Sequence, residues 1–332
     1  MSTRPLRAGL IGLGHMGRHH ARALYALDGV DLVAAVDPAG DPHRIAAGIT
    51  LFTHLDDMLQ HGLDYAVLAA PTSRHTDLGL RLAAAGVPTL IEKPLAPDPE
   101  SARRLVDAYQ SAGLPAMVGY TERFNPAITA LRARLQNGLL GDIFHISTRR
   151  TSTYPARIAD IGVIHDLATH DIDLTAGLTG QQYTSITART AHRSGRPHED
   201  LLAAIAQLAD GAIAQHHVNW LTPAPERVIT VTGEHGSLTA DTIAASLTWC
   251  SNGAPTPTAD QQTYRGVAPG DITRFTPQPA DPLLREHRAF HAALLGHDNE
   301  GACLDAGLHA VLVAHAAATS ALTAHTTPIA VA

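Results

Sequence analysis

The stretch GVIHDLATHDID, residues 162–173, places acids and imidazoles among aliphatic side chains. If it is helical, Asp166, His170 and Asp173 stand at positions i, i+4 and i+7, on one face of the helix. Three roles would suit such a stripe: acids that interact favourably with the dipole at a helix start, a metal site, or a site of proton transfer.

A metal site is the weaker of the two chemical interpretations. His165, Asp166, His170 and Asp173 offer nitrogen and oxygen ligands, but His165 points off the shared face and neither an HExxH motif nor a third histidine accompanies them. We therefore predict proton transfer without a metal. His170 can accept a hydroxyl proton near neutral pH, and Asp166, one turn earlier, can hydrogen-bond the hydroxyl or orient the imidazole.

The bulk composition indicates a soluble protein of two domains. The 332 residues exceed one ordinary core, and 45% hydrophobic with 17% charged residues is typical of globular proteins. A net charge of −7 gives no reason to expect nucleic acid or an anionic membrane as partner. We see no uninterrupted apolar run of 18 residues, no signal sequence and no CxxC around Cys250 or Cys303, so we expect a cytoplasmic location.

A glycine motif, GLGHMG at residues 12–17, follows an apolar run and opens a helical pattern, the context in which G-x-G-x-x-G predicts a dinucleotide site. Gly12 permits the tight turn, Gly14 lets the backbone approach a pyrophosphate, and Gly17 allows close packing of helix on strand. His15 and Met16 lie between these glycines and are expected to line the same site.

Asp37 ends the next predicted strand, residues 30–37, and follows Gly17 by 20 positions (37 − 17). A carboxylate at this spacing accepts hydrogen bonds from the adenosine ribose and repels a 2′-phosphate. Pro38 and Ala39 follow, so no adjacent Arg or Ser would hold that phosphate, and we predict NAD as the cofactor. A simple turn or N-cap role for Asp37 is the alternative.

Strands at 64–71, 87–94 and 114–120 alternate with helices at 75–86 and 99–112, which predicts a parallel sheet with ligands at the carboxyl ends of its strands. Residues at or near such ends are Pro71, Thr72, His75, Glu92, Lys93 and Tyr120. A lysine is rarely buried at the end of a strand unless its charge has a partner or a function, so Lys93 is a functional candidate. An ion pair with Glu92 is the alternative. His75 either lines the nicotinamide pocket or caps its own helix.

The pattern changes after residue 122. A helix at 126–136 precedes strands at 142–149, 184–191, 201–208, 212–220, 228–232 and 237–240, joined by short turns that predict an antiparallel sheet. We read residues 251–282 as a long excursion or lid, and 283–295 and 305–323 as helices. The expected α/β architecture is a Rossmann domain, 1–122, and an α+β domain, 123–332, whose last helices could pack on the first. The open sheet needs cover, which predicts a homodimer or homotetramer.

Three separated motifs, GLGHMG (12–17), EKP (92–94) and DLATH (166–170), make the whole chain resemble the glucose-fructose oxidoreductase, inositol dehydrogenase and rhizopine catabolism (Gfo/Idh/MocA) family of sugar oxidoreductases. In that family the Lys of E-K-P and the Asp and His of the helix meet at the nicotinamide. The resemblance implies that Lys93, Asp166 and His170 form the catalytic set, with the charge of Lys93 facing the developing alkoxide.

Shorter matches, among them GYTERFNPA (119–127), HED (198–200) and VTGEHG (231–236), are similar to the subgroup of UDP-N-acetylglucosamine 3-dehydrogenases. This implies oxidation of a secondary hydroxyl, at C3, of a sugar or aminosugar with hydride transfer to NAD. Residues 224–227 lack a lysine that is usual in the subgroup, which leaves the exact sugar open. The Ala-, His- and Thr-heavy composition would also suit secondary metabolism, so an aminoglycoside sugar is the alternative substrate. A second alternative is a non-catalytic NAD-binding regulator, which would have no need of the intact catalytic set.

Further polar residues are candidates for holding the substrate, including a nucleotide-sugar diphosphate. They are Tyr120, Arg123, Asn125, Arg149, Arg150 and Arg157. An ordinary solvated role is the alternative for each arginine.

Overall fold

The computed structural model describes residues 4–330 except 42, 47, 156–160, 254–268 and 299, and it divides into two compact units. The first contains residues 4–124 and 281–315, and the second contains 125–280 and 316–330. The division after Phe124 lies close to the predicted domain boundary. A later segment of the chain, 281–315, returns to the first unit.

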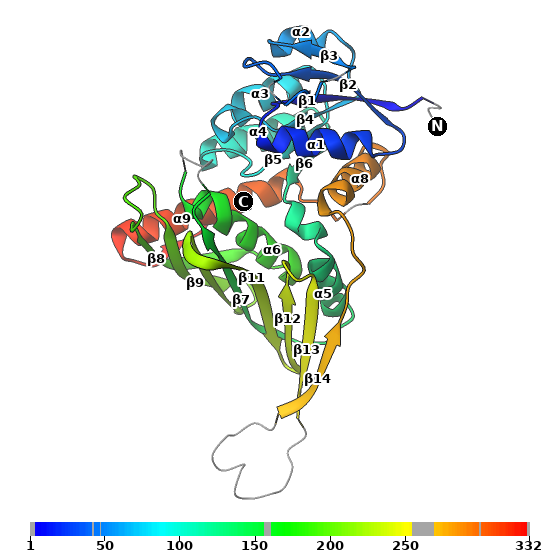
Figure 1. Ribbon diagram of the computed structural model, residues 1–332. Helices are drawn as coiled ribbons and strands as arrows, with labels where there is room; N and C mark the ends of the chain where they lie inside the picture. Colours follow the sequence, from blue (N-terminus) through cyan, green and yellow to red (C-terminus); the bar gives the residue numbers. More distant parts are fainter. Residues whose placement is uncertain are drawn as a thin grey trace, which may run out of the picture. The chain divides into compact units, whose positions relative to one another are not determined.

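Six parallel strands form the sheet of the first unit in the order β3-β2-β1-β4-β5-β6 (Figure 1). The strands are β1 (Leu6–Ile11), β2 (Val30–Val36), β3 (Thr50–Phe52), β4 (Tyr65–Leu68), β5 (Thr89–Glu92) and β6 (Ala116–Gly119). The helices are α1 (His15–Tyr25), α2 (Leu55–Leu59), α3 (Thr72–Ala84), α4 (Pro99–Ser111), the short η1 (Thr121–Phe124) and α8 (Pro282–Leu294). The predicted doubly wound Rossmann sheet is confirmed, and strand order reverses between β1 and β4, where such sheets bind ligands.

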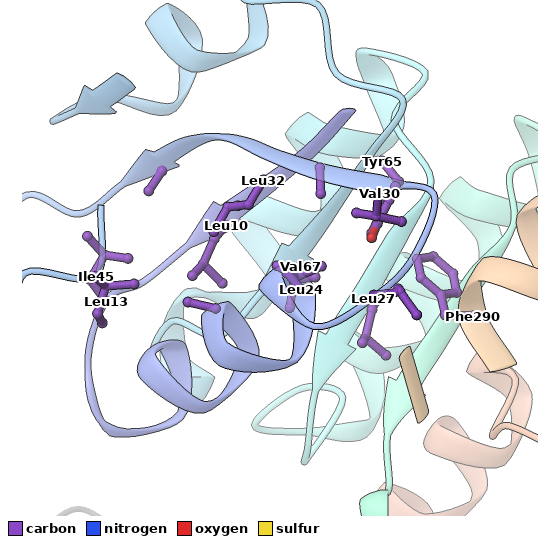
Figure 2. Close-up of a cluster of buried hydrophobic side chains, with 14 of the residues drawn as sticks. Leu10, Leu13, Leu24, Leu27, Val30, Leu32, Ile45, Tyr65, Val67 and Phe290 are labelled. Atoms are coloured by element: carbon purple, nitrogen blue, oxygen red, sulfur yellow. The ribbon is translucent and has the colours of Figure 1, made fainter. Parts of the chain in front are cut away.

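Side chains from α1, β1, β2, β4 and α8 meet in one buried cluster of the first unit (Figure 2). Phe290 of α8 lies edge-on against Tyr65 of β4, with ring centroids 5.7 Å apart, and both rings are about 1% exposed. Burial of two such rings is worth several kcal/mol on the usual scale of apolar burial. This contact explains why α8 belongs to the first unit, although most other elements of that unit lie before residue 125.

Nine strands form the sheet of the second unit in the order β14-β13-β12-β11-β7-β10-β9-β8-β15. They are β7 (Ile143–Thr153), β8 (Tyr183–Ala191), β9 (Leu201–Leu208), β10 (Ile213–Asn219), β11 (Leu221–Gly233), β12 (Gly236–Asp241), β13 (Ser246–Asn252), β14 (Pro269–Phe275) and β15 (Thr327–Pro328). The helices are α5 (Pro126–Gln136), the π turn η2 (Ile164–Ala168), α6 (Thr169–Thr179) and α9 (Leu304–Thr323), which starts in the first unit.

Two sequence-based expectations for this sheet need correction. The sheet is mostly antiparallel, but β10 pairs parallel with β7, because β8 and β9 come between them in the chain and pair on the other side of β10. Residues 251–282 are not simply an excursion, since β13 and β14 pair antiparallel at its two ends. Pro269 and the proline-rich sequence around it hide β14, because an edge strand tolerates proline where a central one does not. Residues 254–268 lie outside the described part.

Helix α9 is long and apolar enough to cross a membrane by length and composition alone, and more than half of its most apolar window is buried within the protein. Asp305, His309 and His315 interrupt its apolar residues, so the sequence contains no uninterrupted apolar run of 18 residues here. Extensive burial inside the protein is typical of the core helix of a globular domain.

A buried histidine links three strands of the second unit. His216 of β10 lies 2.8 Å by Nδ1 from the Thr148 hydroxyl of β7 and 2.8 Å by Nε2 from the Tyr183 hydroxyl of β8. Its side chain is 1% exposed, and burial lowers the pKa of His216 to about 4. The folded protein therefore holds this imidazole neutral well below the pH at which a free one is protonated.

Acid should accordingly destabilise the protein through His216. As pH falls below about 6.5, His216 becomes protonated in the unfolded chain but stays neutral in the folded one. This difference should lower the free energy of unfolding by about 2 kcal/mol between pH 6.5 and 5. His216→Asn should lower stability at pH 7 yet show a shallower decline with acid, measured by urea unfolding at several pH values. An unchanged slope in the variant would contradict this assignment.

Candidate active site

The turn between β1 and α1 has the shape that a dinucleotide diphosphate needs. Gly12 has φ +92°, and a Cβ there would lie 2.7 Å from the Ala69 carbonyl oxygen, while a Cβ on Gly17 would overlap the Gly12 carbonyl. Nothing lies within 4 Å of a Cβ built on Gly14, so the backbone is open in front of the helix. His15 and Met16 form the first turn of α1. Free backbone N–H groups at a helix start are where phosphates bind.

Asp37 follows β2 and is fixed by two backbone groups: its Oδ2 accepts from Leu13 N–H and its Oδ1 from Ala39 N–H, each at 2.8 Å. Each carboxylate oxygen keeps a second lone pair for a ribose hydroxyl. Asp37 lines a cavity of about 470 Å³ at the carboxyl ends of β1, β2 and β4, shared with Gly12 and Pro71. The described residues therefore fit NAD, and the contact of Asp37 with the ribose stays a prediction.

Two arginines of the same cavity, Arg74 and Arg81 on α3, were missed in the sequence. Arg81 Nη2 lies 2.5 Å from Asp56 Oδ1, and Arg74 Nη2 lies 3.3 Å from Asp77 Oδ2. Their positions at i and i+7 on the helix that starts after β4 could have placed both on the cavity side. Because both pair with acids, Asp37 stays the group suited to choose between NAD and NADP.

The E-K-P loop begins where β5 ends. Glu92 is 5% exposed; its Oε2 accepts from the Lys93 N–H at 3.0 Å, and its Oε1 lies 2.8 Å from His20 Nε2. Burial alone would raise the pKa of Glu92, but the hydrogen bond from His20, the charge of Lys93 and the hydrogen bond from the Lys93 backbone outweigh it, so the pKa is lowered. The buried carboxylate is therefore ionised at neutral pH.

His75 of α3 holds the other side of this loop. Its Nδ1 lies 3.0 Å from the Pro94 carbonyl oxygen and its Nε2 2.9 Å from the Ala70 carbonyl oxygen. Burial lowers the pKa of His75 although both carbonyls act in the opposite direction. The side chain thus bridges the loops after β4 and β5, and it does not cap its own helix, which starts with Thr72 after the cap residue Pro71. Contact of His75 with the cofactor stays a prediction.

Lys93 is the only lysine among the 332 residues, against 23 arginines (24 − 1). Arginine and lysine are not interchangeable, since the ammonium is a compact point charge with three rotatable donors. A chain that uses arginine at every other cationic position keeps lysine here. This is a signal in the sequence that the motif analysis overlooked, and it singles out the E-K-P loop without reference to any family.

In the second unit, Asp166 and His170 lie where a π turn meets a helix. Asp166 is in η2 and is 8% exposed, while His170 is half-buried in the first turn of α6. The predicted continuous α-helix is thus wrong at its start. A π turn contains more residues than an α turn, which brings residues four apart closer to one line, and such turns are frequent at functional sites.

Glu199, in the HED motif, holds the start of this helix. Its Oε1 accepts from Ile164 N–H at 3.0 Å, and its backbone oxygen accepts from Val163 N–H at 3.1 Å. A Cβ on Gly162 would overlap the Glu199 carboxylate, so a larger residue there would displace that carboxylate from Ile164 N–H. The loop around Glu199 therefore supports the helix that carries Asp166 and His170.

The remaining acids of the stretch, Asp171 and Asp173, are buried. Asp171 Oδ1 accepts from Arg150 Nε at 2.9 Å, with both side chains at most 4% exposed. Asp173 is 2% exposed. Burial is the main cause that raises the pKa of Tyr183; the Thr175 hydrogen bond opposes it, and the charges of Asp171 and Asp173 add to it. Both acids are therefore buried where α6 packs. Asp173 does not lie on an exposed face of the helix together with His170.

The predicted substrate residues near the end of the first unit have structural contacts. Tyr120 is 1% exposed. Arg123 Nη1 donates to the Gly301 carbonyl at 3.2 Å. Asn125 starts the second unit, where its Oδ1 caps α5 at Ala127 N–H, 3.0 Å away.

The arginines of β7 point to opposite faces of the sheet. Arg150 is buried towards α6, whereas Arg149 is exposed on the other face and forms an ion pair with Glu226. Alternation along a strand therefore separates Arg149 from the face that carries α6. Arg157 lies outside the described residues. Among those described, no group of three or more His, Cys, Asp or Glu could hold a metal ion.

Two family profiles match the chain: an oxidoreductase family with an NAD-binding Rossmann fold, Gfo/Idh/MocA, over residues 6–120, and the C-terminal domain of the same family over 128–239. The chain belongs to the Gfo/Idh/MocA family. It is an NAD-dependent oxidoreductase of sugars or polyols, as the sequence motifs predicted.

Curated relatives agree with this membership. Inositol 2-dehydrogenase 4 of Saccharopolyspora erythraea is 36% identical over 198 residues, 57% of this chain and 58% of that protein. The rhizopine catabolism protein MocA of Rhizobium meliloti is 31% identical over 219 residues, 62% of this chain and 68% of that one. Inositol 2-dehydrogenase 2 of Saccharopolyspora erythraea is 28% identical over 342 residues, 98% and 96% of the two chains.

Solved structures are similar over nearly the whole chain. UDP-N-acetylglucosamine 3-dehydrogenase GnnA from Acidithiobacillus ferrooxidans has a TM-score of 0.82 at 27% identity, covering 95% of this chain and 97% of that one. GenD2 from gentamicin A biosynthesis, in complex with NAD, has a TM-score of 0.82 at 23% identity, covering 99% and 98%. The latter likeness shows the fold.

Asp37 should set cofactor choice. Asp37→Ser combined with Ala39→Arg should weaken NAD by at least about tenfold and admit NADP, because the change removes a ribose acceptor and supplies a cation for the 2′-phosphate. Steady-state kinetics with both cofactors would measure this. A wild-type protein that already prefers NADP would overturn the role assigned to Asp37.

Proposed function

We propose that this protein oxidises a secondary hydroxyl, at C3, of a sugar or aminosugar such as UDP-N-acetylglucosamine, with NAD as hydride acceptor. The observation that carries the proposal is the placement of the single lysine on a loop fixed by buried groups of the cofactor-binding unit. Asp166 and His170 on a specialised helix start supply the matching acid and base. The likeness to the 3-dehydrogenase GnnA supports the choice of substrate.

In the proposed reaction, His170 takes the hydroxyl proton as the hydride leaves the same carbon. Asp166 hydrogen-bonds the hydroxyl or orients the imidazole, and the Lys93 ammonium stabilises the developing alkoxide. Bound NAD supplies the electrophilic carbon that receives the hydride. The proposal requires these three residues to meet around one substrate, a meeting of the two units that stays a prediction.

Ion pairs of two arginines bear on which residues we expect to bind a diphosphate. Arg149 pairs with Glu226 and Arg150 with Asp171, which favours Arg123 and Arg157, the latter outside the described residues, for that role. The substrate should therefore be tested with and without its nucleotide. Wild-type protein with NAD should produce NADH absorbance with UDP-N-acetylglucosamine; free N-acetylglucosamine, an aminoglycoside and myo-inositol complete the panel. If the protein oxidises only free N-acetylglucosamine, the aminoglycoside or myo-inositol, the proposal of UDP-N-acetylglucosamine as substrate is wrong.

The catalytic set should separate from cofactor binding. His170→Ala should lower kcat on the order of 10²–10⁴-fold, the usual worth of a general base, and Lys93→Met should be at least as damaging. NADH affinity, read by fluorescence, should change little in either. The wild-type rate should rise with pH as the base loses its proton, and that rise should vanish in His170→Ala.

His165→Ala is the matched control, because His165 belongs to the same turn and would be a ligand only in a metal site. It should alter kcat by less than about threefold, and a chelator should have no effect. If turnover survives His170→Ala but is lost with chelator or with His165→Ala, the stretch is a metal site and this mechanism is wrong.

We further infer a cytoplasmic homodimer or homotetramer in which the exposed face of the nine-stranded sheet is covered by a second copy. Ile205 of β9 and Ile213 of β10 are 58% and 48% exposed on that face, next to a hollow of about 310 Å³ between β7, β10 and β11. Light scattering should give a dimer or tetramer. Ile205→Glu should shift the mass towards the monomer, since it would bury a charge. A monomeric wild type would contradict the inference.

A further inference from the structure

A chain of three buried side chains lies behind the E-K-P loop in the first unit. His287 Nε2 of α8 is 2.9 Å from His20 Nδ1 of α1, and His20 Nε2 is 2.8 Å from Glu92 Oε1 of β5. The three residues are 1%, 0% and 5% exposed. The second carboxylate oxygen of Glu92 accepts from the Lys93 backbone N–H. The hydrogen-bonded path therefore runs from α8 to the residue proposed to face the substrate.

The protons of this chain have one consistent arrangement. Nδ1 of His287 makes no hydrogen bond within the described residues, and a proton there would be a buried donor without an acceptor, which is costly. Burial lowers the pKa of His287, so it is neutral with its proton on Nε2. His287 then donates to His20 Nδ1, and His20 donates from Nε2 to the Glu92 carboxylate. Every N–H in the chain has an acceptor.

We propose that His20, Glu92 and His287 are positioning residues of the dehydrogenase, which fix the loop of Lys93 from the protein interior. The inference rests on the proposed function of Lys93. A neutral imidazole offers one donor and one acceptor, so His20 can join two partners across the core. His20 also lies on the helix that begins at the glycine turn, so one element connects the diphosphate site to the E-K-P loop.

The role predicts an effect on turnover without an effect on cofactor binding. His20→Leu removes both hydrogen bonds and should lower kcat on the order of 10–100-fold, the scale expected for a small displacement of a catalytic group, with NADH affinity within about threefold of wild type. His20→Gln keeps a donor towards Glu92 and should recover most of the loss. His287→Leu removes only the hydrogen bond between His287 and His20, so kcat should fall less than in His20→Leu, again with little change in NADH affinity. This variant provides the test if His20→Leu does not fold.

Tyr109→Phe is the matched control. It deletes a buried hydrogen bond of 2.7 Å to Thr89, on the same strand as Glu92, and should lower stability while leaving kcat unchanged. Equal effects on kcat from His20→Leu and Tyr109→Phe would reduce the chain to an ordinary core contact and overturn the proposal.

The single lysine supplies a second readout that needs no substrate. Reductive methylation with ¹³C-formaldehyde labels only Lys93 and the amino terminus, because the chain has no other amine side chain. The dimethyl-Lys93 NMR signal should shift or broaden in His20→Leu, return towards wild type in His20→Gln and stay unchanged in Tyr109→Phe. An unmoved signal in His20→Leu would refute the positioning role even if no sugar is oxidised, whereas a moved signal without sugar turnover would refute only the proposed function.

Discussion

The ionised carboxylate of Glu92 in the interior of the first unit is the interaction on which most of the proposed site depends. A buried charge is tolerated only when hydrogen bonds and opposite charge compensate for lost hydration. His20 supplies one hydrogen bond, the Lys93 backbone another, and the Lys93 ammonium the opposite charge. These groups come from α1 and the end of β5, so compensating the charge also fixes where the loop lies.

The many histidines, which look like compositional bias in the sequence, prove to include several core residues. His20, His75, His216 and His287 are each at most 1% exposed, and each joins elements that are distant in the chain. A neutral imidazole can donate at one nitrogen and accept at the other, which suits it to bridge two polar groups inside a core. Burial lowers the pKa of His75, His216 and His287, which keeps these bridges neutral.

The helix that carries Asp166 and His170 divides its polar residues by what they touch. Asp171 forms a buried ion pair with Arg150 of the sheet and Asp173 is also buried, whereas His170 is half-buried in the turn that follows η2. Glu199 holds the helix start through a backbone and a side-chain hydrogen bond. The buried ion pair with Arg150 and the bonds from Glu199 therefore explain how a largely buried helix tolerates Asp171 and keeps its start in place.

The sequence by itself determined the parallel sheet, the glycine turn with Asp37 and the family, because these depend on local spacing: alternating strands and helices, glycines where no side chain fits, and an acid at a fixed distance. The sequence also shows that Lys93 is the only lysine, an indication of a special role that does not depend on any motif. Only the tertiary structure decided that α8 returns to the first unit, that β10 lies parallel to β7, that Arg150 is an internal ion pair while Arg149 is exposed, and that His20 and His287 stand behind Glu92. The physical reason is that these are contacts between residues up to 267 positions apart, which no local pattern of hydrophobicity or propensity encodes.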